Sequence, residues 1–498
     1  MTTSPRSGLP TSLLPAFRLV VAIALAAAGC STTPSAPAPT QNPGPTSVAS
    51  APGASASATP NRTEPPASPS PPPPPSPSPS SSAGSALVPG SVDRSTLTLD
   101  ATYDVDLGVD SATGEIVVGT TIVARNASGT TIDRLELNTI AARLGDIDVT
   151  GASVDGRPVE PRVTDQTLVL PLGGILADGA SITVQMAYRA TLRADLDGSD
   201  WMFSRVGGTL ALYRWIPWLS RAVPFDRPNH GDPFVTPSSP LVRVRVTTDV
   251  PLILASPGAE ATRDGLRWTF EARDVRDVAV VLAPDFEVTT GDGEGFPIRA
   301  YTRPGGLDGD RLVAQAQHAL TRMTDRLGVA YPWASFSVVE TAGGYGMESP
   351  GLIWIPRGTP SANLPYLVHH ETAHQWFYGL VGSDQQAEPF ADEAPADLLA
   401  RTILGLLRAS RCDRAPLDRS IVRYSRACYY EVVYIQGGNV LDDIRASMGT
   451  DRFWTAMRTY LEAHRFGIGG TRELLESLRA ASSVDLLPTL RSRFPDLY

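Results

Sequence analysis

The chain has 498 residues, a formal net charge of −10 at pH 7 and a hydrophobic content of 42%. This length allows two to four domains with real cores, and the acidic balance argues against a nucleic-acid partner. Lysine is absent and all 42 strongly basic residues are arginines, which excludes a P-loop lysine, a Schiff-base lysine and a lysine general base.

Residues 1–30 are predicted to be a signal peptide of the bacterial lipoprotein type. Arg6 and Arg18 precede an apolar run, residues 19–28, that is too short to span a bilayer but suits a signal-peptide core. The stretch ending at Cys30 resembles a lipobox, which implies a lipidated cysteine that anchors the exported chain to the cell membrane on its extracytoplasmic side. A cleaved secretory signal with an incidental cysteine is the alternative, and it also exports the protein.

Residues 31–90 are predicted to form a disordered tether. They consist mainly of Pro, Ser, Ala and Thr, with almost no large apolar side chain. Such a segment cannot bury enough apolar surface to offset the entropy lost on ordering, and its prolines favour extended conformations. We expect it to hold the following domains away from a membrane.

Residues 91–290 are predicted to form a β-rich domain. Apolar and polar residues alternate in residues 97–107, 182–188 and 242–246, as in strands with one buried face. Turn signals separate these runs at short intervals, and no long helical period intervenes. The pattern predicts an antiparallel saddle or sandwich.

Residues 291–498 change to a helical pattern, so the predicted fold class is α+β. Apolar residues between Leu312 and Leu327 fall at helical spacing, Asp308 can cap the start of the helix and Gly328 can end it. Further strands are expected at residues 336–340 and 352–355, and further helices at 365–382, 393–407, 429–448 and 452–464.

The expected helix over residues 365–382 carries the motif HExxH, formed by His370, Glu371 and His374. Histidines four apart lie on one face of a helix, where both imidazoles can bind one zinc ion. Glu393, with eighteen residues between it and His374, can return as the third ligand and leave one position for water. Glu371 can then accept the proton of that water. His369 does not fit, because only His370 is followed by Glu and by a second histidine four residues on.

These residues resemble the zinc helix of the aminopeptidase N family, gluzincin metallopeptidases that include leukotriene hydrolase. Gly346, Met347 and Glu348 resemble the core of the family's GAMEN motif. This implies that Glu348 binds the α-amine of a peptide whose backbone pairs with the motif. Residues 432–438 resemble the VYEKGA segment, which implies that Tyr434 donates to the oxyanion. Tyr213 to Pro217 also resemble the family, so the implied architecture is a β-saddle followed by a thermolysin-like catalytic domain.

Four departures from the family pattern leave alternatives open. Ser349 replaces the Asn of GAMEN, Pro395 stands in the segment Asp-Glu-Ala-Pro where the family has Asn-Glu-Gly-Phe, and Gln436 replaces the lysine of VYEKGA. The family's large C-terminal helical domain has no counterpart, which predicts an open cleft. Zinc aminopeptidase activity on peptides is the leading hypothesis. A zinc endopeptidase and a catalytically silent surface binding module are the alternatives.

Three further expectations concern single side chains. Asp397, four residues after Glu393, is hypothesised to orient a ligand histidine, and a solvated carboxylate is the alternative. Cys412 and Cys428 can form one disulfide in an oxidising compartment or remain two free thiols. His318 is predicted to be a packing or surface residue.

Overall fold

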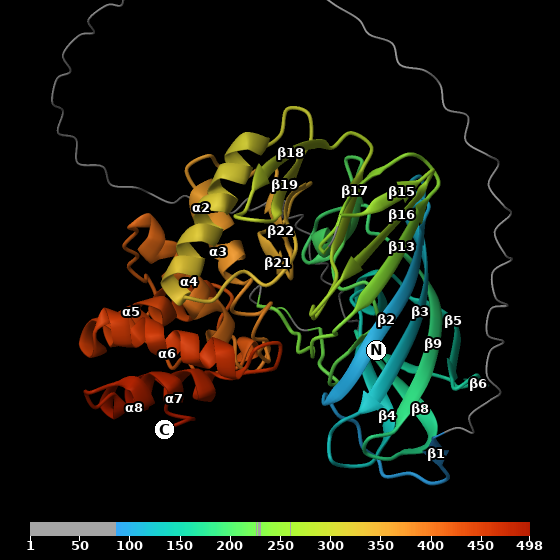
Figure 1. Cartoon of the computed structure of the whole chain (residues 1–498), viewed down its shortest axis with the longest axis horizontal. Helices are drawn as coiled ribbons and strands as arrows, with labels where there is room; N and C mark the ends of the chain where they lie inside the picture. Colours follow the sequence, from blue (N-terminus) through green and yellow to red (C-terminus); the bar gives the residue numbers. More distant parts are fainter. Residues whose placement is uncertain (1–85, 226, 228–230, 259) are drawn as a thin grey trace, which may run out of the picture. The chain divides into compact units, whose positions relative to one another are not determined.

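The computed structural model describes residues 86–498 except 226, 228–230 and 259 (Figure 1). The predicted signal peptide with Cys30 and the tether up to residue 85 lie outside the described residues. Leu87–Val88 were predicted to belong to the tether, but they form strand β1 and pair with β8. Within the described part, no helix is long and apolar enough to cross a membrane.

The N-terminal part consists of three β-sheets, the largest of which has eight strands in the order β15-β16-β13-β2-β3-β9-β5-β6. Buried and exposed positions alternate along its long strands, as the sequence pattern predicted. Neighbours are antiparallel except β13 and β2, which are parallel. The strands of this sheet are β2 (Leu99–Val109), β3 (Glu115–Asn126), β5 (Asp148–Val154), β6 (Arg157–Pro158), β9 (Ser181–Thr191), β13 (Val242–Thr248), β15 (Thr262–Asp264) and β16 (Arg267–Ala272).

Two smaller sheets complete the β-rich part. One has the order β1-β8-β4-β12 with β7 added to β8, and the other the order β10-β11-β17-β14. The predicted α+β class with an N-terminal β-saddle is confirmed. The strands are β4 (Ile132–Asn138), β7 (Arg162–Thr164), β8 (Thr167–Leu176), β10 (Phe203–Val206), β11 (Thr209–Leu212), β12 (Trp218–Leu219), β14 (Ile253–Ala255) and β17 (Val280–Ala283), with the short helices α1 (Ala141–Leu144) and η1 (Asp200–Met202).

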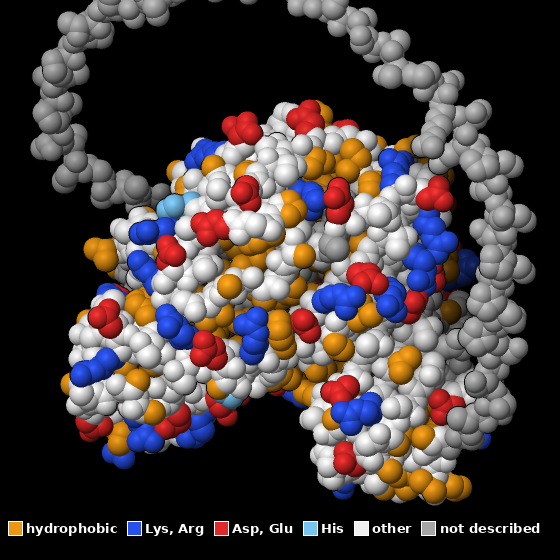
Figure 2. All heavy atoms as spheres, viewed as in Figure 1, with side chains coloured by type: hydrophobic (Ala, Val, Ile, Leu, Met, Phe, Trp, Pro, Cys, Tyr) orange, Lys and Arg blue, Asp and Glu red, His pale blue; other side chains and the backbone are white. Residues whose placement is uncertain are grey.

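The solvent face of the eight-stranded sheet carries pairs of opposite charge across neighbouring strands. Arg245 on β13 lies opposite Asp106 on β2, and its guanidinium contacts Asp106 and Asp104. Arg243 pairs with Glu271 in the same way. Figure 2 shows basic and acidic side chains intermixed over this side of the molecule. Such exposed pairs add little stability individually, but they keep this face free of a large apolar patch.

The C-terminal part begins with a five-stranded sheet in the order β18-β19-β20-β22-β21. Helix α2 (Gly309–Leu327) packs on it, and both predicted caps are confirmed: Asp308 accepts a hydrogen bond from the Arg311 N–H, and Gly328 adopts a left-handed φ of 64°. Trp354 on β22 contacts aromatic rings of the β-rich part, so the two parts share a core. The strands are β18 (Glu287–Asp292), β19 (Pro297–Thr302), β20 (Phe336–Thr341), β21 (Met347–Ser349) and β22 (Leu352–Pro356).

The helix that carries HExxH, α3 (Leu364–Ala373), is shorter than predicted. After Ala373 the backbone bonds first tighten, with Gln375 N–H donating to Thr372 O, and then widen, with Gly379 N–H donating to His374 O. Tyr378 then adopts a φ of 119°, which no helix continues. The prediction of a helix up to Gly382 is therefore wrong. His374 nevertheless keeps helical backbone angles, φ −64° and ψ −8°.

The remaining helices follow the predicted order. The helix predicted from residue 429 is confirmed but contains a π-helical segment, η3 (Glu431–Gln436), which carries Tyr434. Segments of this kind are frequent at functional sites. The predicted elements are α4 (Phe390–Leu404), η3, α5 (Gly437–Met448) and α6 (Thr450–Ala463). Three further helices were not predicted, η2 (Ile421–Arg423), α7 (Thr471–Ala481) and α8 (Leu487–Arg493).

Arg276, in the loop between β16 and β17, connects the β-rich part to the turn that follows α3 through hydrogen bonds. Its side chain is buried and donates to the backbone carbonyls of Thr236 at 2.7 Å, Gly379 at 3.1 Å and Gly467 at 3.0 Å. Burial lowers the pKa of Arg276 to about 10, so the guanidinium stays charged at neutral pH. These bonds join three segments that are far apart in the sequence.

We expect the substitution Arg276→Met to lower the free energy of unfolding by about 2–4 kcal/mol, because several buried carbonyls would lose their donor. Denaturant unfolding followed by fluorescence would measure this change. Arg273→Met is the matched control, since Arg273 lies in the same loop with its side chain 64% exposed. The control should stay within about 0.5 kcal/mol of the wild type. Equal stability of the two variants would contradict the role of Arg276.

Candidate metal centre and active site

Three buried side chains converge where the end of α3 meets the first turn of α4. His370 Nε2 lies 3.2 Å from Glu393 Oε2 and 3.2 Å from His374 Nε2, and the His374 Nε2 to Glu393 Oε2 distance is 3.4 Å. All three residues are buried. The structure thus brings together the three predicted metal ligands.

The spacing and chemistry of these atoms fit a zinc ion. Nitrogen and oxygen ligands about 2.0–2.1 Å from a tetrahedral zinc ion lie about 3.3–3.4 Å from one another. His374 Nδ1 donates to Asp392 Oδ1 at 2.7 Å, so the proton of a neutral imidazole sits on Nδ1 and the Nε2 lone pair faces the centre. The donor set therefore suits one divalent cation.

Buried charge around the centre shifts several pKa values. Burial raises the pKa of Glu371 to about 8, against the opposing effect of His374. Burial also raises the pKa of Glu348 well above its ordinary value. For Glu393 burial acts in the same direction, but the bonds from His370 and His374 outweigh it and hold the pKa at about 2. Burial thus favours the neutral forms of Glu371 and Glu348, and a bound divalent cation would favour their ionised forms.

Glu371 lies directly over the backbone of Gly346. A Cβ atom at position 346 would stand 2.1 Å from Glu371 Oε1, so only glycine leaves room for the carboxylate. Gly346 immediately precedes β21, which contains Met347 and Glu348 and forms one end of the five-stranded sheet. One ligand atom each of Glu348, Glu371 and His374 lies within 4.8 Å of the others. The predicted amine-binding and proton-accepting carboxylates therefore share the metal centre.

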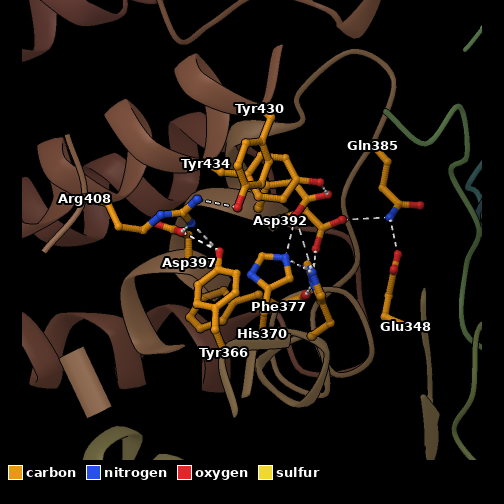
Figure 3. A network of polar contacts seen from close by, with 12 residues as sticks. Glu348, Tyr366, His370, Phe377, Gln385, Asp392, Asp397, Arg408, Tyr430 and Tyr434 are labelled. Atoms are coloured by element: carbon orange, nitrogen blue, oxygen red, sulfur yellow. Dashed lines mark hydrogen bonds and ion pairs between the residues drawn. The ribbon is translucent and has the colours of Figure 1, made fainter. Parts of the chain in front are cut away.

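Tyr434 reaches the centre from the π-helical segment. Its hydroxyl donates to Glu393 Oε1 at 2.5 Å, and its ring stacks on His370 with the centroids 5.3 Å apart. Tyr366 stacks near the same imidazole, at 5.7 Å. Figure 3 shows these rings around His370. The predicted oxyanion donor is thus within hydrogen-bond reach of the ligand set.

Asp397 makes no described contact with a ligand histidine. It is fully buried, accepts a hydrogen bond from the Tyr366 hydroxyl at 2.7 Å and forms ion pairs with Arg401 and Arg408. Its described link to His370 is the hydrogen bond from Tyr366, whose ring stacks near that imidazole, and it is not a solvated carboxylate either. The direct partner of a ligand histidine is Asp392.

Sequence reasoning missed Asp392 and Gln385. Asp392 precedes Glu393 directly, which is the one sequence signal that could have pointed to it. Gln385 lies in the connection between α3 and α4 and donates to both Glu348 and Asp392 (Figure 3). No spacing rule marks Gln385, because the connection is irregular.

Ser349, the first departure from the family pattern, points away from the metal ligands. Its hydroxyl donates to Asp277, which also accepts a hydrogen bond from the Tyr378 hydroxyl. Arg214 in turn donates to the Tyr378 oxygen at 2.7 Å. Ser349 therefore belongs to a buried polar network shared with the β-rich part.

Two further departures, Pro395 and Gln436, lie in helical segments. Pro395 is inside α4, which begins at Phe390, three residues earlier than predicted. The Gln436 amide donates to the carbonyls of Cys412 and Asp413 at 3.0 and 2.9 Å. Neither side chain displaces a predicted ligand.

Cys412 and Cys428 form a disulfide. It joins the loop after α4 to the start of the helix that carries Tyr434. The same loop supplies Arg408, which donates to the Tyr430 hydroxyl and pairs with Asp397. The disulfide thus fixes a segment that packs against the candidate active site.

His369 and His318 form a separate pair where α3 packs against α2. His318 Nδ1 lies 2.9 Å from His369 Nε2, and His369 Nδ1 donates to Pro365 O at 2.7 Å. Burial lowers the pKa of His369 to about 4. His318 is exposed on α2, in agreement with the packing or surface role predicted for it.

Comparisons with known proteins point to one group. No protein-family model matches the sequence. Solved structures that resemble the chain include an M1 zinc metallopeptidase from Deinococcus radiodurans, at a TM-score of 0.63 and 19% identity over 79% of this chain and 93% of that one. The chain has the fold of the M1 zinc metallopeptidases. A variant of that protein bound to a Tyr-Ser-Ala substrate matches 82% of this chain and 96% of its own, at a TM-score of 0.61 and 19% identity.

Curated relatives of the chain carry aminopeptidase names. Aminopeptidase 2 of Candida albicans is 25% identical over 264 residues, which cover 45% of this chain, and aminopeptidase N of Streptomyces lividans is 23% identical over 239 residues, or 39%. The aligned regions span only 28% and 27% of those proteins. The resemblance to the aminopeptidase N family is confirmed, and zinc is the metal that this M1 group implies.

Proposed function

We propose that the chain is a zinc metallopeptidase, and that it acts as an aminopeptidase that removes N-terminal residues from peptides. The observation that carries the proposal is the convergence of His370, His374 and Glu393 beside two further buried carboxylates, Glu371 and Glu348. The aminopeptidase names of the relatives and the peptide bound to a similar structure support peptides as the substrate class.

His370, His374 and Glu393 would hold the zinc ion, which when bound polarises the scissile carbonyl and acidifies the attacking water. Glu371 accepts the proton of that water and passes it to the nitrogen of the leaving amine. The Tyr434 hydroxyl donates to the oxygen on which negative charge develops. Asp392 keeps the proton of His374 on Nδ1.

Glu348 binds the free α-amine of the peptide. It is buried on β21, whose described neighbour on one side is β22. A peptide that adds to the other side of β21 as an extra strand would bring its N-terminal ammonium to this carboxylate. The ammonium would favour the ionised form of Glu348, and burial would strengthen the attraction between the two charges. The amine thereby sets which peptide bond reaches the metal centre.

The deciding experiment compares free and N-acetylated peptides of one sequence with the zinc-loaded wild-type protein. We expect release of the first residue from the free peptide and a rate at least about 100-fold lower for the acetylated peptide, because acetylation removes the charge that Glu348 binds. A zinc chelator should abolish the reaction and added zinc should restore it.

The same experiment separates the alternatives. Cleavage of both peptides at an internal bond would contradict aminopeptidase action and favour the endopeptidase. A purified protein without zinc and without hydrolysis of either peptide would favour the silent binding module. A chelator-insensitive reaction would contradict metallopeptidase activity altogether.

A further inference from the structure

Gln385 links Glu348, which is proposed to bind the substrate amine, to Asp392, which accepts a hydrogen bond from the metal ligand His374. Its side chain is buried, and its Nε2 donates to Glu348 Oε1 at 2.9 Å and to Asp392 Oδ2 at 2.7 Å. Its Oε1 accepts from Arg214 Nη2 at 3.2 Å. Figure 3 shows Gln385 between the two carboxylates.

The orientation of this amide is fixed by its partners. A guanidinium has only donors, so the oxygen of Gln385 must face Arg214 and the NH₂ group must face the two carboxylates. The backbone N–H of Gln385 donates to Phe234 O at 2.9 Å, which holds the residue against the β-rich part. Both N–H groups of the side-chain amide therefore donate hydrogen bonds, one to each carboxylate.

A neutral bridge is suited to this position for an electrostatic reason. A lysine or arginine between Glu348 and Asp392 would neutralise the charge of Glu348 and compete with a substrate ammonium. An amide orients both carboxylates without removing their charge. Asp392 keeps Oδ1 for His374, and the second oxygen of Glu348 accepts no hydrogen bond from any described residue.

We propose that Gln385 is a positioning residue that couples recognition of the substrate amine, through Glu348, to retention of the metal, through Asp392 and His374. The inference rests on the proposed aminopeptidase function. It predicts that one substitution changes both the KM for free-amine peptides and the affinity for zinc.

The test uses Gln385→Leu in the full chain, with Gln386→Leu as the matched control. Gln386 is the next residue, is half-buried, and its side chain takes part in no described hydrogen bond. For Gln385→Leu we expect KM for a free-amine peptide to rise about 10- to 100-fold, with kcat at saturating zinc changed less than about threefold, because a bond that orients a charged group is lost. Zinc affinity, measured by chelator competition without substrate, should fall about 10-fold.

A second substitution locates the effect. In a Glu348→Gln background, adding Gln385→Leu should leave KM unchanged but still weaken zinc binding, since only the Asp392 contact remains to be lost. If Gln385→Leu fails to fold by thermal melting, Gln385→Asn replaces it, because its shorter side chain cannot reach both carboxylates. Wild-type KM and wild-type zinc affinity in a folded variant would overturn the proposal.

The outcomes also separate this inference from the proposed function. A wild-type protein that does not hydrolyse free-amine peptides would refute the aminopeptidase. The zinc affinities of Gln385→Leu and Gln386→Leu would still test the contact with Asp392, and equal affinities would overturn the coupling.

Discussion

Glu371→Gln is expected to keep zinc bound and to lower kcat by a factor of about 10² to 10⁴. The substitution keeps the size of the side chain but removes the group that accepts the proton of the attacking water, and general-base catalysis contributes about that factor. Glu371 is not one of the three side chains whose atoms converge as ligands, so the metal should stay. Steady-state kinetics and metal analysis of the same sample measure the two effects.

The control for this substitution is Glu462→Gln, on the exposed face of α6. It changes the charge of the chain by the same amount far from the centre in sequence, and its kcat should equal that of the wild type. Full activity of Glu371→Gln would remove Glu371 from the mechanism. Loss of zinc together with activity would instead assign it to metal binding.

Tyr434→Phe is expected to lower kcat by a factor of about 10² to 10³ with little change in KM. The hydroxyl is the donor proposed for the oxyanion, and loss of one such donor costs about that much. The phenylalanine ring can still stack on His370, so zinc content should be preserved. Kinetics at saturating zinc with one free-amine peptide would measure the split between kcat and KM.

Tyr430→Phe is the matched control, because Tyr430 lies four residues earlier on the same helix and its hydroxyl contacts Arg408. We expect its kcat to stay within about threefold of the wild type. If both tyrosine variants lose activity equally, the effect lies in the packing of this helix. If Tyr434→Phe keeps full activity, another group stabilises the oxyanion.

Local sequence patterns were sufficient to predict the long strands, helix α2 and the metal ligands. Alternating polarity identified the long strands, and the caps Asp308 and Gly328 located α2 to within a residue at each end. The fixed spacing of HExxH and Glu393 identified three side chains that the fold brings together. In each case the information lies within one turn of helix, one strand or one motif.

Such patterns could not identify the residues that orient the metal ligands. The partner of His374 depends on how residues 374–389 turn back toward α3, and that path includes the positive φ of Tyr378 and hydrogen bonds to the β-rich part. Asp397 was predicted to orient a ligand histidine because it lies one helical turn from Glu393. Its carboxylate is instead bonded to Tyr366 and to two arginines. Side chains that meet through tertiary packing leave no periodic trace in a sequence.

The polar network through Ser349, Asp277, Tyr378 and Arg214 limits where this chain can be divided without losing contacts near the candidate active site. Arg214 and Asp277 come from the β-rich part, yet they hold Gln385 and the turn after α3. Residues far upstream of the zinc motif therefore hold two side chains beside the candidate active site, Gln385 and Tyr378. A fragment cut before the five-stranded sheet would keep every metal ligand and lose the groups that orient their surroundings, so the smallest catalytic unit is both parts together.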